Sequence, residues 1–392
     1  MNLFESEKVA KLAAVISVFL FVVTFFPHQA FAWRSEDGRL SASGFVEFYY
    51  QEHSEEEGSL TEISPLVVNF QWEPTDRVNV LWEIEANHAP RTQHEHFFGD
   101  KKVVEGDVDF VKRLFIDYDL ENAGNIRAGK SYRELGYWIS TDWTYYSPTY
   151  NRPNIPEFGL TVPTPLGISY YDNYDINRDM SLNYNLAVYR PGWNNTNRVF
   201  KDKDEEENDI PEGELGESYL LSADLDLFRN YNIGAAYYHV KDRSEDIDFD
   251  KGEYSTEFHS LGLDWLQFYG RADNLLDGNL TLRAEYAVIE TNMEEDDSVM
   301  KDFDEVTHRS FYADAEYRLN HRWSVYARYG TGDDLPRGFS TWMPTAPPPL
   351  NGDDEFKDLG LDEYTAAIRW LPSPGLQVRL EHSRFDWDVK EA

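Results

Sequence analysis

The feature of this chain that most constrains its fold is a two-residue alternation of apolar and polar side chains. In residues 311–330, FYADAEYRLNHRWSVYARYG, one parity carries apolar and aromatic residues and the other carries most of the charges. Successive side chains of a β-strand point to opposite faces of a sheet. The segment therefore predicts a hairpin that turns at Asn320 and His321 and has one apolar and one charged face.

The same alternation recurs along the rest of the chain and predicts an all-β protein of fifteen strands. Most run for 9–13 residues, the length of a tilted membrane-spanning strand, whereas strands of soluble proteins average about 5–6. The predicted strands are 39–51, 62–72, 77–88, 107–119, 125–132, 165–175, 180–191, 217–227, 231–241, 255–268, 278–290, 307–319, 322–330, 361–371 and 375–387. Bacterial single-chain barrels have even strand numbers. We therefore expect sixteen strands, or else fourteen, with a missed strand in 133–164 or 340–360.

The connections between these strands alternate between short and long. The short turns are 73–76, 121–124, 177–179, 229–230, 320–321 and 372–374, and the long loops are 89–106, 133–164, 192–216, 242–254, 291–306 and 331–360. Aromatic residues such as Trp72, Trp323 and Trp370 stand beside the short turns, as in the interfacial girdle of a membrane barrel. This arrangement predicts a transmembrane antiparallel β-barrel with short periplasmic turns and long extracellular loops.

The N-terminus and the composition predict an exported protein. Lys8 and Lys11 precede an apolar run, and Ala30-Phe31-Ala32 forms a small-residue cleavage pattern, so we predict a signal peptide at 1–32 and a single barrel domain at 33–392. The chain has no cysteine, which excludes a disulfide framework and a thiolate metal site. The net charge of −36 argues against nucleic acid as a partner.

The charged parity of the strands predicts a water-filled interior. A charged side chain facing lipid at the bilayer midplane costs about 2–4 kcal/mol, so the charges are expected to face a lumen. The predicted pore-lining residues are Glu83, Glu85, Asp109, Arg113, Asp117, Asp224, Asp226, Arg283, Glu285, Asp314, Glu316, Arg318, Arg328, Arg369, Arg379 and Glu381. About sixteen strands leave an aqueous channel. Because carboxylates outnumber basic groups on this face, we predict a preference for cations.

The segment NIRAGKSYRELGYW, residues 125–138, resembles the strand that enters the long, inward-folded loop of Gram-negative outer-membrane porins. Arg127, Gly129 and Lys130 match its R-x-G-K form, and an aromatic, proline-rich loop near 133–164 follows. The resemblance implies passive diffusion of small hydrophilic solutes or ions through a homotrimer, with membrane lipid and lipopolysaccharide as partners. An inward loop would form a pore constriction from Arg127, Lys130, Arg133, Glu134, Asp142 and Glu157.

Other motifs carry less weight, and we expect no cofactor, metal or catalytic residue. Residues 246–257 resemble a calcium loop, but the glycine stands at position seven instead of six. The histidines at 94 and 96 lie in a predicted loop. Two alternatives stay open from the sequence. One is an outer-membrane barrel enzyme or adhesin that acts through its extracellular loops, and the other is a soluble secreted carbohydrate-binding β-protein.

Overall fold

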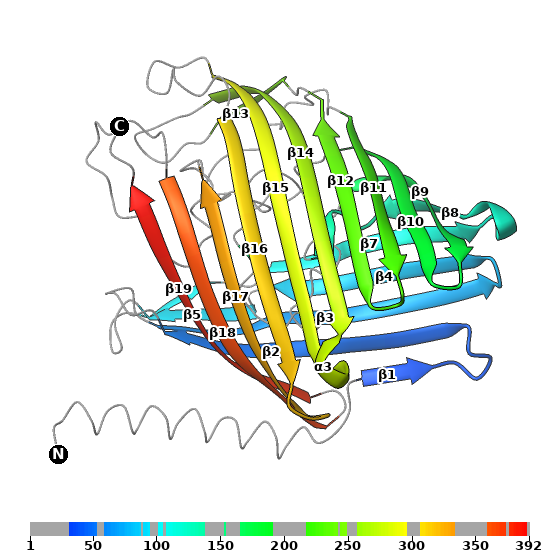
Figure 1. Cartoon of the computed structure of the whole chain (residues 1–392), viewed down its shortest axis with the longest axis horizontal. Coiled ribbons are helices and arrows are strands. Elements are labelled where there is room, and N and C mark those ends of the chain that lie inside the picture. The colour runs from blue at the N-terminus through cyan, green and yellow to red at the C-terminus, as the bar shows by residue number, and fades with distance from the viewer. Residues whose placement is uncertain are drawn as a thin grey trace.

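The structure is a computed structural model, and it describes most of the chain after residue 30. The described ranges are 31–52, 59–87, 89–94, 101–104, 107–137, 153, 165–190, 217–241, 244–248, 257–295, 306–333, 359–373 and 376–389. They form one continuous antiparallel sheet that curves into a barrel, so the predicted fold class is confirmed (Figure 1).

Nineteen strands make up this sheet. The first ten are β1 (Phe31–Arg34), β2 (Leu40–Glu52), β3 (Ser59–Thr75), β4 (Val78–Asn87), β5 (Ala89–His94), β6 (Lys101–Val104), β7 (Asp107–Asp119), β8 (Asn125–Lys130), β9 (Leu166–Asn177) and β10 (Met180–Arg190). The others are β11 (Ser218–Leu227), β12 (Tyr231–Val240), β13 (Ser244–Asp248), β14 (Glu257–Asn274), β15 (Leu280–Glu295), β16 (Val306–Arg318), β17 (Trp323–Asp333), β18 (Leu359–Ser373) and β19 (Leu376–Val389).

Three of the strands continue a neighbour and add no new position to the wall. The strands β4 and β5 both pair with β3 and share one position in the wall. On their other side, β7 pairs with β4 and β6 pairs with β5, so β6 and β7 also share one position. The strands β12 and β13 share a third, because both pair with β14. Sixteen wall positions remain, the even number that the sequence predicts. The strand missing from the sequence prediction is β1, which pairs with Ser41–Gly44 of β2. It lies across the predicted signal-peptide boundary, and not in either of the two long segments expected to hold it.

The outer face of the barrel is apolar. Large hydrophobic side chains point outward at alternate positions, and they include Trp82, Ile168, Leu221, Ile233 and Tyr364. Their cross-strand partners share this face, as Leu182 does with Leu225 and Val325 with Ile368. Near the turns, Trp323 stacks on Trp370 with ring centroids 5.4 Å apart. These surfaces suit lipid, as the alternation predicts.

Short turns gather at one rim of the barrel, and the strand ends joined by longer connections lie at the other (Figure 1). The turns include the short helices η1 (Glu121–Ala123) and α3 (Leu275–Gly278). Arg39 pairs with Asp76, and Arg77 with Glu121, so ion pairs link adjacent turns. Helices of the described ranges are all too short or too polar to cross a membrane.

The C-terminal strand extends past the aromatic residues at which the sequence prediction ends it. Asp388 and Val389 pair with Gly360 and Leu359 of β18, so the first residues after Trp387 belong to the wall.

Candidate functional site

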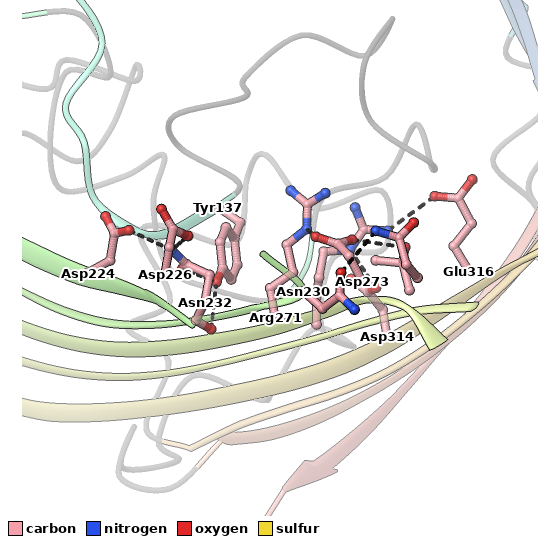
Figure 2. Close-up of polar contacts among 12 residues, drawn as sticks. Tyr137, Asp224, Asp226, Asn230, Asn232, Arg271, Asp273, Asp314 and Glu316 are labelled. Carbon is pink, nitrogen blue, oxygen red and sulfur yellow. Dashed lines mark hydrogen bonds and ion pairs between the residues drawn. The ribbon is translucent and has the colours of Figure 1, made fainter. Parts of the chain in front are cut away.

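The inner wall near the short-turn rim carries a row of polar side chains that runs across consecutive strands. Register places each member opposite the next, from β11 to β17, in the order Asp226, Asn232, Arg271, Arg283, Asp314 and Arg328. Because directly opposed residues point to the same face, the whole row faces the interior. We call this row, together with the inward carboxylates beside it such as Asp224 and Glu316, the ionic belt (Figure 2).

Most arginines of this inner wall are paired with carboxylates. The pairs are Arg113 with Glu83, Arg127 with Asp117, Arg283 with Asp314, Arg369 with Glu316, and Arg328 with Glu363. Arg328 and Glu363 are both fully buried. The paired groups therefore do not depend on lumen water, contrary to the expectation from the charge pattern alone. Four of these arginines pair with a carboxylate on an adjacent strand, and Arg369 of β18 pairs with Glu316 of β16, two strands away. Such pairs cannot be read from single strands.

Two carboxylates of the belt have amide partners instead of arginines. The Nδ2 of Asn183 donates to Asp224 at 2.8 Å and to Asp226 at 2.9 Å. From the other side, the Nδ2 of Asn232 donates to Asp224 at 2.5 Å and to Asp226 at 2.8 Å. The amides fix both carboxylates in place but carry no charge. This part of the wall therefore keeps its negative charge.

The inner wall farther from the short turns carries buried apolar side chains. Cross-strand neighbours Leu220, Tyr238, Trp265 and Ile289 form a second row there, and each is almost fully buried. Leu135, from the segment after β8, packs into the same cluster. The interior is thus divided into an ionic belt and an aromatic cluster, whereas the sequence predicts water throughout.

The segment after β8 folds into the barrel, at least over Ser131–Tyr137. The backbone N–H of Tyr137 donates to Oε1 of Glu285 at 2.7 Å, and its hydroxyl donates to Oδ1 of Asn232 at 2.6 Å. Figure 2 shows Tyr137 reaching the wall beside Asp224 and Asp226. The remainder of the predicted inward loop, except Pro153, lies outside the described residues.

Glu285 is the wall residue that holds this segment. Its carboxylate is almost fully buried and also accepts hydrogen bonds from the Tyr312 hydroxyl at 2.5 Å and from the Gln267 amide. Burial raises the pKa of Tyr137 well above its ordinary value, so its hydroxyl stays a donor. The inner wall thus holds the segment through two hydrogen bonds of Tyr137, one from its backbone N–H and one from its hydroxyl.

Arg133 anchors the segment in a different way. Its guanidinium is fully buried and stands 4.8 Å from the ring centroid of Tyr238 and 5.9 Å from that of Trp265. None of its nitrogens has a hydrogen-bond partner within the described ranges. The aromatic rings are therefore its visible partners, through cation–π attraction.

Glu134 points the other way, toward a polar cavity of about 350 Å³. The cavity is lined by Asn125, Glu134, Tyr171, Asp172, Asn173, Asn183, Tyr184, Ser222 and Asp224. Burial raises the pKa of Glu134, and the Arg127 charge and a hydrogen bond from Asn185 oppose this increase. A second cavity, of about 270 Å³, lies near α3 and is lined in part by Arg271, Arg283 and Arg318.

The structure brings together only part of the predicted constriction. Arg127 pairs with Asp117, and Glu134 lies near both, but Lys130 stands opposite Leu114 and Leu166 on the outward row. Because Leu114 and Leu166 are exposed on the outer face, Lys130 also lies on that face and does not line the lumen. Asp142 and Glu157 lie outside the described residues.

The predicted lining residues fall on inward positions wherever their side chains are described. Glu85 pairs with Lys112 at 3.2 Å, Arg379 stands opposite Arg369, and Glu381 accepts a hydrogen bond from Ser383. For Asp109 only the backbone, in β7, is described.

Several residues of the site are absent from the sequence prediction. Asn183, Asn232 and Gln267 stand on the inward parity of predicted strands, so the same alternation could have found them. Arg271 lies beyond the predicted strand 255–268, in the last turn-side residues of β14, and Tyr137 lies in a predicted loop, so neither could be found in this way. The role of Tyr137 depends on a loop that reaches a strand 148 residues away.

Comparison with solved structures gives the same architecture. Outer-membrane expressed OmpT of Vibrio cholerae aligns with a TM-score of 0.53 at 11% identity, over 91% of this chain and 90% of that one. The trimer form of the same protein aligns at 0.52 and 12% identity, over 88% and 89%. An anion-selective porin from Comamonas acidovorans aligns at 0.50 and 11% identity, over 89% of each chain. No family model and no curated protein matches the sequence.

The fold is therefore the porin-like outer-membrane β-barrel. The likeness spans nearly the whole of both chains. At 11–12% identity the likeness shows the fold alone.

Proposed function

We propose that the protein is a porin-type channel in the outer membrane of a Gram-negative bacterium, and that it passes small hydrophilic solutes or ions by passive diffusion. The observation that carries the proposal is the opposition of two faces. The outer face is apolar around the barrel, while the same strands present an ionic belt inward and enclose a folded-in segment at Ser131–Tyr137. Inward charges without an opposite partner, such as those of Asp224 and Asp226, favour an aqueous interior in a barrel that is surrounded by lipid.

We further propose that the channel prefers cations. The support is a contrast between the partners of carboxylates and arginines on the polar part of the inner wall, whereas Arg133 is buried among aromatic rings. Asp224 and Asp226 are bound by neutral amides, while the arginines at 113, 127, 283, 328 and 369 each face a carboxylate. A paired charge adds little to the potential along a pore, and an uncompensated one adds most.

The remaining proposals concern assembly and chemistry. One solved neighbour is described as a trimer form, and a homotrimer is the assembly proposed here, surrounded by lipid and lipopolysaccharide. The channel acts without catalysis. The signal peptide at 1–32, the single domain at 33–392 and the completion of the constriction by Asp142 and Glu157 are retained as proposals.

The test is conductance in a planar bilayer, with ion preference read from the reversal potential in a KCl gradient. The expected result is stepwise, ohmic conductance and a potential of the sign set by K⁺. Asp142→Asn with Glu157→Gln, and separately Asp224→Asn, should move that potential toward zero. Purified protein that inserts without conductance would refute the channel. Conductance with unchanged potential in all variants would refute these carboxylates as the source of selectivity.

A further inference from the structure

The cavity beneath the folded-in segment is built almost entirely from hydrogen-bond acceptors and neutral groups. None of its nine lining residues is basic. Asp224 enters from β11, Asp172 from β9 and Glu134 from the folded-in segment, so three carboxylates from separate parts of the chain line one space. Asp226 lies beside Asp224 and is linked to it through Asn183 and Asn232.

These carboxylates retain capacity for further hydrogen bonds. In Asp224, both amide donors bind Oδ1, and no contact of the described chain occupies Oδ2. A carboxylate has about four acceptor positions, so two amide donors leave half of them open. The two asparagines also prevent the carboxylates from moving apart. The pair is therefore pre-organised for a donor that enters from the cavity.

A separate observation at the same cavity also indicates a donor-rich ligand. Asn185 is 2% exposed, and within the described chain its Oδ1 has no hydrogen-bond partner. It stands in register between Tyr171 and Ser222, which both line the cavity, so its side chain points to the same side. A buried acceptor left without a partner costs about 1–3 kcal/mol. A ligand with several N–H groups would remove this cost.

The basic groups nearest to the cavity are already committed. Arg127 binds Asp117 through two hydrogen bonds, at 2.7 and 3.1 Å, and Arg271 pairs with Asp273 at 2.7 Å. Neither lines the cavity. Asp224 therefore has no basic partner among the described residues, and a cation from outside the protein can fill this place.

We infer that this cavity is a retention site for small organic cations that carry a guanidinium or primary ammonium group. Asp224, which the shared amides hold beside Asp226, binds the cationic head, and Glu134 and the Oδ1 of Asn185 accept further N–H groups. The site rests on the proposed channel function and gives it a solute class. Charge alone would attract any cation, whereas this acceptor array selects those with N–H donors.

The experiment compares two monovalent blockers of similar size in planar bilayers. Ethylguanidinium has several N–H donors, and tetramethylammonium has none. Ethylguanidinium should reduce the K⁺ current of the full-length channel at a concentration at least about tenfold below that of tetramethylammonium, because charge-assisted hydrogen bonds distinguish them. Equal blocking by the two ions would overturn the inference. It would leave the channel and its cation preference intact, and absence of any current would instead refute the channel.

Variants locate the effect. Asp224→Asn should lower the ethylguanidinium advantage by about tenfold, and Glu134→Gln on the folded-in segment gives a second, independent handle if the strand variant fails to insert. Glu316→Gln is the matched control, because it also removes one inward negative charge, but from a carboxylate bound to Arg369 and Arg283. An equal loss in the control would refute the site. Stronger block by Ca²⁺ alone, abolishing the ethylguanidinium effect, would also overturn it in favour of a metal site.

Discussion

Replacement of Gly136 by alanine should release the folded-in segment from the inner wall. Gly136 has φ of +70°, a left-handed conformation that residues with a Cβ rarely adopt. A Cβ added there would collide with Nε2 of Gln267 and Oε2 of Glu285. Both side chains are buried and hydrogen-bonded to each other, so neither can move aside cheaply.

The magnitude follows from two contributions. A Cβ in the left-handed region costs about 1–2 kcal/mol. The displacement also breaks the 2.7 Å bond from the Tyr137 N–H to Glu285, and a hydrogen bond to a charged group contributes about 1.5–3 kcal/mol. Docking of the segment should therefore weaken by about 2.5–5 kcal/mol, while the wall itself stays intact.

Two other glycines provide matched controls. Gly278 in α3 has φ of +85° and nothing within 4 Å of an added Cβ, so Gly278→Ala should cost about 1–2 kcal/mol in the turn alone. Gly270 in β14 has an ordinary φ and its nearest atoms at 4.0 Å, so Gly270→Ala should be close to neutral.

The assay is single-channel recording together with urea unfolding in lipid vesicles. Gly136→Ala should give a larger, noisier conductance with an unfolding midpoint close to that of the parent. The two controls should keep the parent conductance. If Gly136→Ala and Gly278→Ala behave alike, the contact with Glu285 carries no energy and the proposed anchoring is wrong.

Three further predictions concern the wall and the cavity. Arg328→Ala leaves the fully buried Glu363 uncompensated and should cost about 3–5 kcal/mol by urea unfolding, whereas the double replacement of both residues by alanine should cost less than the single one. Leu221→Arg places a charge on the outward face within β11 and should cost about 2–4 kcal/mol, against about 0–1 for Leu319→Arg beside a short turn; equal costs would contradict the lipid-facing assignment. Because burial raises the pKa of Glu134 above 4.5, the folded protein binds this proton more readily than the unfolded chain. Acidification through the raised pKa therefore stabilises the fold and lowers cation preference, and Glu134→Gln should abolish this step in reversal potential against pH.

Strand positions and faces could be predicted because they depend on local alternation. All fifteen predicted strands are present, and in the hairpin at 311–330 Asp314 stands opposite Arg328 on the inner face, with Ala313 opposite Tyr329 outside. The hydrophobic pattern determines which face meets lipid, since a register slip of one residue would turn every side chain over.

The sequence prediction failed where a strand lacks such alternation. The short strands β5, β6 and β13 lie in segments predicted as loops. In the structure β5 pairs with β3, β6 with β5, and β13 with β14. The strand β1 has only four residues and overlaps a cleavage pattern. The formation of such short strands depends on pairing with a neighbouring strand more than on the β-propensity of their own residues.

The sequence by itself determined the barrel, its apolar exterior and the set of side chains that face inward, because a period of two residues is a property of each strand alone. The tertiary structure decided what those inward residues do. Glu363 is paired with an arginine, Asp224 with amides, and Trp265 with other apolar groups, according to which residues the neighbouring strands bring within reach. The folded-in segment added Arg133 to the aromatic cluster and Glu134 to the polar cavity. Partners of this kind are set by register and by contacts between distant parts of the chain, and these arise only when the sheet has curved into a barrel.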